Sequence, residues 1–289
     1  MAEALKAKTA TSSRLTTTDE AAKCVSEALG KLSDITEKRY AMPHVKLVNM
    51  KAESWQMGGA FICREAYFER AEGGTKVIGS GPVIKVRNGE PPIVAYHETI
   101  HHARSENRVD DIMFEDSFAR WAMEEMCAVV ASNLLKPTGV TKPIEDMYKY
   151  GPFYLSTPQS NVDVLDRLVD AFKSADVEGT MLDEKKIAGI FRSALRTKKL
   201  PGEPGAAEEY VIGMALGVML LASNGMDEAK TIKDAATLNS ERLLDKAVGA
   251  VRSQKAMKHL EGIQKDLRTA FPRTGFSRLE SAIDWLLPS

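Results

Sequence analysis

The sequence is poor in cysteine and has no excess of charge of one sign. Its 289 residues include three cysteines, Cys24, Cys63 and Cys127, which are widely spaced and form no Cys-x-x-Cys pair. This spacing excludes a disulfide framework and a thiolate zinc finger, and it favours a reducing compartment. The 39 basic residues nearly balance the 40 acidic ones, which gives a net charge of −1. We therefore expect no nucleic-acid partner and no attraction to an anionic membrane.

Long apolar runs and the signature of a secretory leader are also missing. The longest apolar stretch, residues 210–222, is shorter than the roughly 20 residues that span a bilayer, and it fits a buried helix better. Residues 1–20 are polar and lack an apolar central segment. These absences predict a cytoplasmic protein with no membrane partner.

The pattern of apolar residues, glycine and proline predicts an α+β fold. A helix over 18–39 precedes a small mixed or antiparallel sheet, and two further helices follow, from about 92 and over 110–135. Dense glycines predict tight turns, including one at Gly79–Gly81. Four strands are predicted: 44–50, a second one formed by 60–63 and 66–68, 75–78 and 82–86. The later helices cover 161–175, 182–198, 206–223, 227–251, 256–270 and 276–287. We divide the chain into a flexible N-terminus (1–17), a mixed domain (18–155) and a helical C-terminal domain (156–289).

Histidine is scarce, yet three of the five histidines lie within six residues. The segment from His97 to His101 fits the pattern His-Glu-x-x-His. On a helix, two histidines four residues apart lie on one face and can share one Zn²⁺. Glu98 lies about 100° further round the helix, where it can act as the general base towards a water at the metal without binding the metal itself.

A catalytic zinc site needs a third protein ligand, and the next predicted helix offers Glu124 and Glu125. Small side chains share the face of Glu124 and would let two helices approach closely. Glu125 lies within the more apolar stripe, where a carboxylate is costly unless it is paired or metal-bound. Both remain open, and we favour Glu124 slightly. His102 points to another face of its helix and is a poor third ligand.

The stretch Glu124–Pro137 resembles the second ligand helix of the ImmA/IrrE-type peptidases, which belong to the gluzincin group of zinc metallopeptidases. Aligning the Leu-Leu-x-Pro end of that pattern places Glu124 on the first Glu of the family. The resemblance implies a zincin-like catalytic domain over 18–155, Zn²⁺ as cofactor, and hydrolysis of a peptide bond in a protein or peptide substrate. Two positions depart from the pattern, because Ala128 replaces a polar residue and Met126 replaces the second acid.

Three further residues are candidates for orienting the site or for stabilising an oxyanion. Peptidases of this group usually add a side chain that donates a hydrogen bond to the developing negative charge. Tyr148 and Tyr150 follow the ligand helix closely, and His102 lies next to the motif. Each also fits an ordinary packing role.

The helical C-terminal domain carries no catalytic motif and leaves a second hypothesis open. The chain could be a structural or assembly protein, for example of a phage particle or a toxin–immunity system, with a vestigial or structural zinc site. Gly213 and Gly217 would allow close helix packing within the bundle or in an oligomer. A hydrolase acting on another kind of bond is a third hypothesis, since the motif specifies the activated water and not the scissile bond.

Overall fold

A computed structural model describes residues 14–49, 59–71, 74–107, 117–135, 143–150, 158–177, 183–195 and 206–272. The predicted helix at 276–287 and residues 1–13 of the predicted flexible N-terminus lie outside these ranges. The elements are α1 (Thr18–Thr36), β1 (His44–Val48), β2 (Gly59–Ala71), β3 (Gly74–Arg87), α3 (Pro92–Glu106), α4 (Ser117–Leu135), α5 (Pro143–Tyr150), α6 (Pro158–Val177), α7 (Glu184–Leu195), α8 (Ala206–Ser223), α9 (Glu228–Thr237), α10 (Ser240–Arg252) and α11 (Gln254–Ala270). The predicted α+β class is confirmed.

The chain forms two compact units whose residues alternate along the sequence. The first contains residues 1–111, 127–143 and 232–239, and the second contains 112–126, 144–231 and 240–289. Helix α4 contributes residues to both units. The predicted domains 18–155 and 156–289 stay predictions. None of the described helices is long and apolar enough to cross a membrane.

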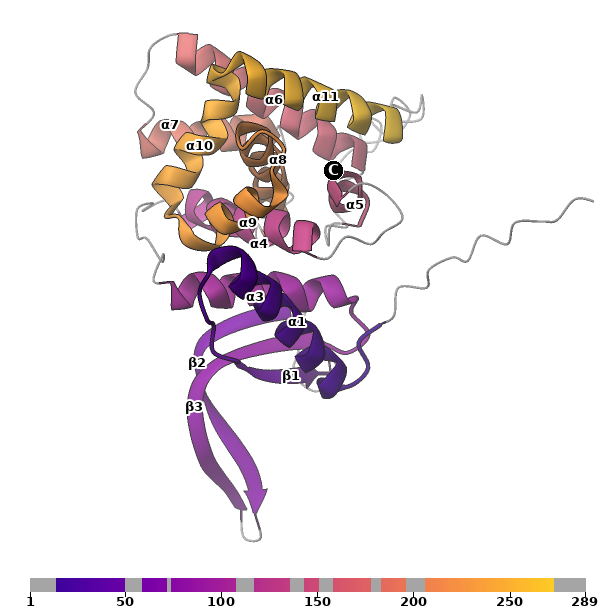
Figure 1. Cartoon of the computed structure of the whole chain (residues 1–289), viewed down its shortest axis with the longest axis vertical. Coiled ribbons are helices and arrows are strands. Elements are labelled where there is room, and N and C mark those ends of the chain that lie inside the picture. Colours follow the sequence, from indigo (N-terminus) through magenta and orange to yellow (C-terminus); the bar gives the residue numbers. More distant parts are fainter. Residues whose placement is uncertain are drawn as a thin grey trace, which may run out of the picture. The chain divides into compact units, whose positions relative to one another are not determined.

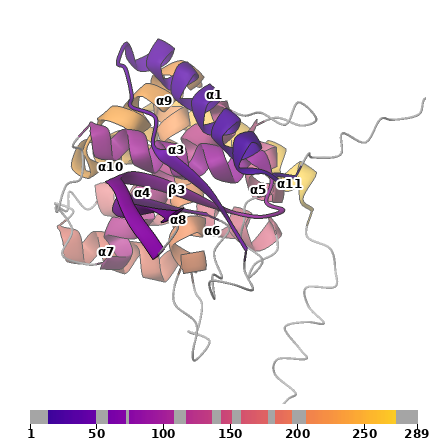
Figure 2. The same cartoon turned by 90° about the horizontal axis from the view of Figure 1, so that it is seen from below.

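The sheet of the first unit has the strand order β1-β3-β2 (Figure 1). β1 runs parallel to β3, with His44 opposite Val83, and β2 runs antiparallel to β3. Helices α1 and α3 pack on each other and on the strands. Both helices lie on the same side of the sheet (Figure 1). Seen from below, the sheet lies in front of α3 (Figure 2). Apolar residues of α1, the sheet and the start of α3, together with Leu15 of the segment before α1, form the core here: Leu15, Ala21, Val25, Leu29, Val45, Ile84, Val86 and Ala95.

The predicted turn at Gly79–Gly81 is wrong, because β3 continues through it. Gly79 pairs with Tyr67 of β2, and Gly81 pairs with Glu65. The register shifts between Ile62 and Glu65 and again between Tyr67 and Phe68. Glycine inside a strand often accompanies such a bulge, so the two glycines accommodate a bent ribbon instead of ending it. β2 and β3 together form a long hairpin (Figure 1).

The start of α3 is fixed by backbone bonds to the N-terminal segment. Leu15 donates to the oxygen of Glu90 and accepts from the nitrogen of Gly89, each at 2.8 Å. Gly89 has a φ of +86°, a conformation that favours glycine. Pro92 then begins the helix, where its missing N–H and fixed φ are no disadvantage. Leu15 is buried, so order in this part of the chain begins before Thr18, within the predicted flexible N-terminus.

In the second unit, α8 is the central helix. It contacts α6, α7, α10 and α11, and residues 211–222 are buried at almost every position. The prediction of one helix over 227–251 is wrong, since α9 ends at Thr237 and α10 begins at Ser240. The side chain of Arg104 binds the backbone oxygens of Ala235 and Leu238 at this break.

Candidate metal centre

Helix α3 carries the His-Glu-x-x-His motif, as the sequence predicts. His97 and Glu98 are buried, at 8% and 5% exposure, and His101 is half-buried. The apolar residues before them, Ala95 and Tyr96, are fully buried and hold this face of the helix against the core. The motif therefore lies on a rigid element and not on a surface loop.

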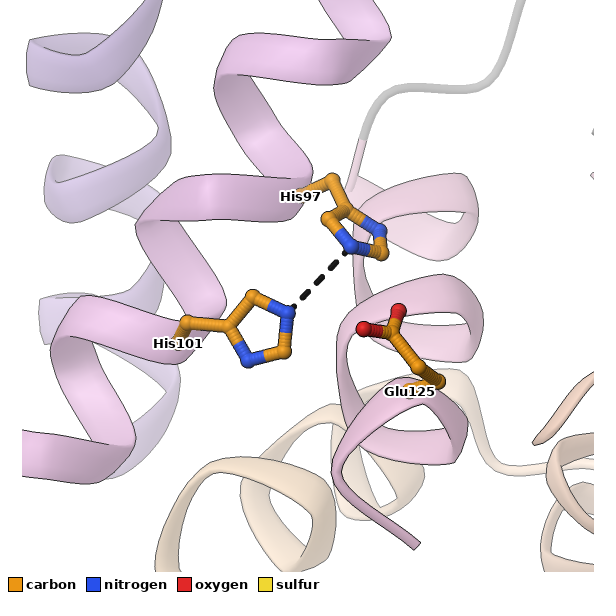
Figure 3. Close-up of side chains that lie close together, drawn as sticks. All are labelled: His97, His101 and Glu125. Atoms are coloured by element: carbon orange, nitrogen blue, oxygen red, sulfur yellow. Dashed lines mark hydrogen bonds between the residues drawn. The ribbon is translucent and has the colours of Figure 1, made fainter. Parts of the chain in front are cut away.

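The two motif histidines face each other. Nε2 of His101 lies 3.3 Å from Nε2 of His97, and the ring centroids are 5.0 Å apart (Figure 3). Two nitrogens bound at 2.0–2.1 Å to one tetrahedral zinc ion lie about 3.3–3.4 Å apart. The observed separation therefore matches a shared ion, and it also permits a hydrogen bond in which one ring donates to the other.

Glu125 of α4 completes a group of three ligand atoms. The nitrogens of His97 and His101 and a carboxylate oxygen of Glu125 all lie within 4.8 Å of one another. Figure 3 shows the three side chains pointing towards one another, with Glu125 on a different helix from the histidines. Two imidazoles and one carboxylate are a donor set that zinc takes in catalytic sites. This group could hold a metal ion.

This geometry favours Glu125, the alternative third ligand, over Glu124, which the sequence alone slightly favours. Among the described residues, the group contains Glu125 and does not contain Glu124. Glu125 is 8% exposed, whereas Glu124 is half-buried. The burial of the Glu125 carboxylate agrees with the expectation that such a group is paired or metal-bound.

A third carboxyl group, that of Glu209, interacts electrostatically with Glu125. Burial, together with the charges of Glu125 and Glu208, raises the pKa of Glu209 to about 7. Glu209 is half-buried near the start of α8. Two negative charges close together in a partly desolvated environment raise the free energy of both carboxylates. A cation bound at Glu125 would lower that free energy.

Buried polar bonds anchor the second half of α3. The guanidinium of Arg104 is 1% exposed and donates to the backbone oxygens of Ala235 at 2.6 Å and Leu238 at 3.1 Å. The amide of Asn107 donates to the oxygen of Ala236 at 2.8 Å. These bonds satisfy carbonyls at the C-terminal end of α9, where a cation is favourable. In the sequence, the only signal of this role is that Arg104 is a basic residue on the motif helix.

Glu98 packs against the first residue of β2. A methyl group on Gly59 would lie 2.8 Å from Oε1 of Glu98 and 2.7 Å from Cγ1 of Val94. Because a side chain at position 59 would collide with Glu98 and Val94, the glycine allows β2 to approach α3 closely. In the sequence, nothing distinguishes Gly59 from the other glycines of this stretch, which predict turns.

His102 takes part in packing within the first unit. Its Nε2 donates to the backbone oxygen of Ala41 at 2.8 Å, and its ring lies 5.4 Å from that of Phe61. It is not a member of the group formed by His97, His101 and Glu125. A role at an oxyanion stays a prediction for His102.

Tyr148 is buried in α5. Its hydroxyl makes no hydrogen bond to the residues that the structure describes. Burial, and secondarily the charge of Asp166, raise the pKa of its phenol above the ordinary value. Its charged neighbour is therefore a residue of α6, and a role for Tyr148 at the metal centre stays a prediction. The side chain of Tyr150 lies outside the described residues.

Compared with protein-family models, with curated proteins and with solved structures, the chain matches none of them significantly. The gluzincin resemblance therefore rests on the His-Glu-x-x-His motif and on a glutamate of the next helix, and the glutamate grouped with the histidines is Glu125, not the aligned Glu124.

Proposed function

We propose that this protein is a zinc-dependent metallopeptidase. The observation that carries the proposal is the 3.3 Å separation of the two imidazole nitrogens, with the Glu125 carboxylate within 4.8 Å of both. The His-Glu-x-x-His spacing adds Glu98 beside the ligands. This combination of two imidazoles, one carboxylate and a second carboxylate on the motif helix is the donor set and base of a metal-assisted hydrolase.

In the proposed reaction, each residue has one task. His97, His101 and Glu125 hold Zn²⁺, which when bound supplies the Lewis acidity that makes water acidic and a carbonyl electrophilic. Glu98 accepts the proton that the attacking water loses and delivers it to the leaving amine. The burial of Glu98 and its contact with β2 limit the positions that its carboxylate can take. A protein or peptide substrate in extended form would add to the outer edge of β2, whose first residue contacts Glu98.

The decisive experiment measures metal content and hydrolysis in the same preparations. The wild type should contain one Zn²⁺ per chain by mass spectrometry and should cleave an unfolded protein substrate. His97→Ala should lose both the zinc and the cleavage. Glu98→Gln should keep the zinc and lose cleavage by about 10²–10⁴-fold, the usual contribution of a general base. Equal zinc content in wild type and His97→Ala would overturn the proposal.

The same measurements separate the peptidase from the structural alternative. Zinc that depends on His97, without any cleavage by the wild type, would favour a structural or assembly role for the site. Light scattering would then report whether the chain forms an oligomer. A cytoplasmic location remains part of the proposal, and the thiols of Cys24 and Cys127, which form no disulfide, agree with it.

A further inference from the structure

Helix α8 touches the backbone of α4 at the turn that carries Glu125. A methyl group on Gly213 would lie 2.7 Å from the backbone nitrogen of Met126 and 3.0 Å from the carbonyl carbon of Glu125. The backbone oxygen of Ala122 would lie 3.2 Å away. Real Cβ atoms essentially never come closer than 3.0 Å to such atoms. The two helix backbones are therefore in direct contact, with no side chain between them.

The environment of α8 leaves this contact little room to relax. Val211, Ile212, Met214 and Ala215, which flank Gly213, are all buried. The helix also contacts α6, α7, α10 and α11. Close-packed interiors transmit a local displacement instead of absorbing it. A side chain at position 213 would therefore move the turn of α4 that carries Glu125.

Glu209 lies on the same face of α8 as Gly213. It precedes Gly213 by four residues, which places it on the same helix face one turn away. The charge of Glu125 contributes to the raised pKa of Glu209, so the two carboxyl groups lie within electrostatic range. This agrees with the backbone contact at Gly213, which carries the inference.

We infer that α8 is a working part of the metal centre, with Gly213 as the positioning residue that sets the place of Glu125. The inference rests on the proposed metal centre. It assigns to the helical C-terminal region, through α8, the role of positioning a metal ligand. Metal–ligand distances tolerate only about ±0.2 Å. A shift of α4 large enough to admit a methyl group exceeds that tolerance, so the carboxylate would leave its place.

The test compares Gly213→Ala with Gly189→Ala. Gly189 is a helical glycine of α7 with open space where a Cβ would lie, so its substitution is a matched control. Circular dichroism in chelator first establishes that each metal-free variant is folded. Zn²⁺ affinity is then measured by competition with a chromophoric chelator, and the geometry by the visible absorption of bound Co²⁺. We expect Gly213→Ala to bind Zn²⁺ about 10–100-fold more weakly than the wild type, with an altered Co²⁺ spectrum, and Gly189→Ala to match the wild type. Wild-type affinity in folded Gly213→Ala would overturn the inference.

A second measurement on the wild type decides the matter if Gly213→Ala does not fold. Hydrogen exchange is recorded with and without Zn²⁺. We expect zinc to slow exchange in α3, in α4 and in α8 around residue 213, and to leave α7 unchanged. Protection of α3 and α4 without any change in α8 would overturn the inference.

Neither readout involves peptide cleavage. A wild type that binds zinc but cleaves nothing would therefore end the peptidase proposal and leave this inference standing. A wild type without zinc bound through His97 would refute the centre and the inference together.

Discussion

At the scale of single residues, the choice between Glu124 and Glu125 decides the composition of the centre. One step along a helix turns a side chain by about 100°, so only one of two adjacent residues can face the histidines. The rotation of α4 about its axis is set by packing, including the contact of Gly213 with Ala122 and Met126. Both residues could be shortlisted from the sequence, but the choice could not be made there because this contact is formed by a helix more than 80 residues further along the chain.

We predict that Glu125→Gln loses zinc and that Glu124→Gln keeps it. Glutamine preserves the shape of the side chain and removes the charge that binds the cation. Zinc affinity of Glu125→Gln should fall at least about tenfold, as measured by competition with a chelator. Glu124→Gln is the matched control on the same helical turn. The reverse result would restore Glu124 as the ligand.

Arg104 is the largest of the fully buried side chains that the structure describes, and it acts through the main chain. We predict that Arg104→Met lowers the free energy of unfolding by about 3 kcal/mol, because two charge-assisted hydrogen bonds disappear and the carbonyls of α9 lose their donor. Urea unfolding measures the change. Arg242→Met, at an exposed position of α10, should change it by no more than about 0.5 kcal/mol. Equal urea midpoints for Arg104→Met and the wild type would contradict the buried role.

At the scale of elements, local sequence predicts what local forces determine. The helical spacing of the motif predicts α3, and the acidic residues after Thr17 predict the start of α1, where Thr17 and Glu20 form a capping box. The errors occur where elements contact one another. β3 continues through Gly79–Gly81, where β2 pairs with it, and the helix predicted over 227–251 is divided at a point where Arg104 binds the end of α9.

The capping box of α1 leads to a prediction that depends on pH. Hydrogen bonds from Thr16 and Thr17 hold the pKa of the Glu20 carboxyl below its ordinary value of 4.5. A lowered pKa in the folded state stabilises the fold above the unfolded pKa, and the effect is lost as the pH falls. Glu20→Gln should therefore be less stable than the wild type at pH 7, and the difference should shrink below about pH 4.5. Thr17→Ala should lose about 1 kcal/mol, and most of that loss should persist across this pH range. Thermal melts of the wild type and both variants from pH 3 to pH 7 provide the measurement. A difference in melting temperature between Glu20→Gln and the wild type that does not change with pH would contradict this role of the Glu20 charge.

The first residue of β2 supplies a prediction about the proposed base. Gly59→Ala would force the carboxylate of Glu98 away from β2, because Oε1 and the new methyl group would lie only 2.8 Å apart. We expect zinc content to stay at the wild-type level, while kcat/KM falls about 10²-fold through misplacement of the base. Unchanged kcat/KM with a folded variant would show that Glu98 does not depend on this contact. Gly262→Ala in α11, where a Cβ meets nothing, serves as control.

At the scale of the whole molecule, metal binding should be linked to unfolding. A ligand that binds only the folded state stabilises it by about 2.7 kcal/mol when its free concentration is 100 times Kd. We predict that Zn²⁺ raises the melting temperature of the wild type and leaves that of His97→Ala unchanged. Calorimetry in chelator and in buffered zinc measures both. Equal shifts in the two proteins would mean that zinc stabilises the fold at another place.

The bonds of Leu15 to Gly89 and Glu90 define where a working fragment of this protein can begin. A shortened chain starting at Thr18 would retain every helix and strand described here. It would, however, lose the two backbone hydrogen bonds between Leu15 and the turn that precedes α3. Arg14 would also be lost, and with it the bond from its guanidinium to the oxygen of Gly89. The shortest fragment expected to keep α3 in place therefore starts at or before Arg14. Protease cleavage between residues 14 and 18 should destabilise the start of α3, although the turn that Arg14 binds lies 75 residues downstream.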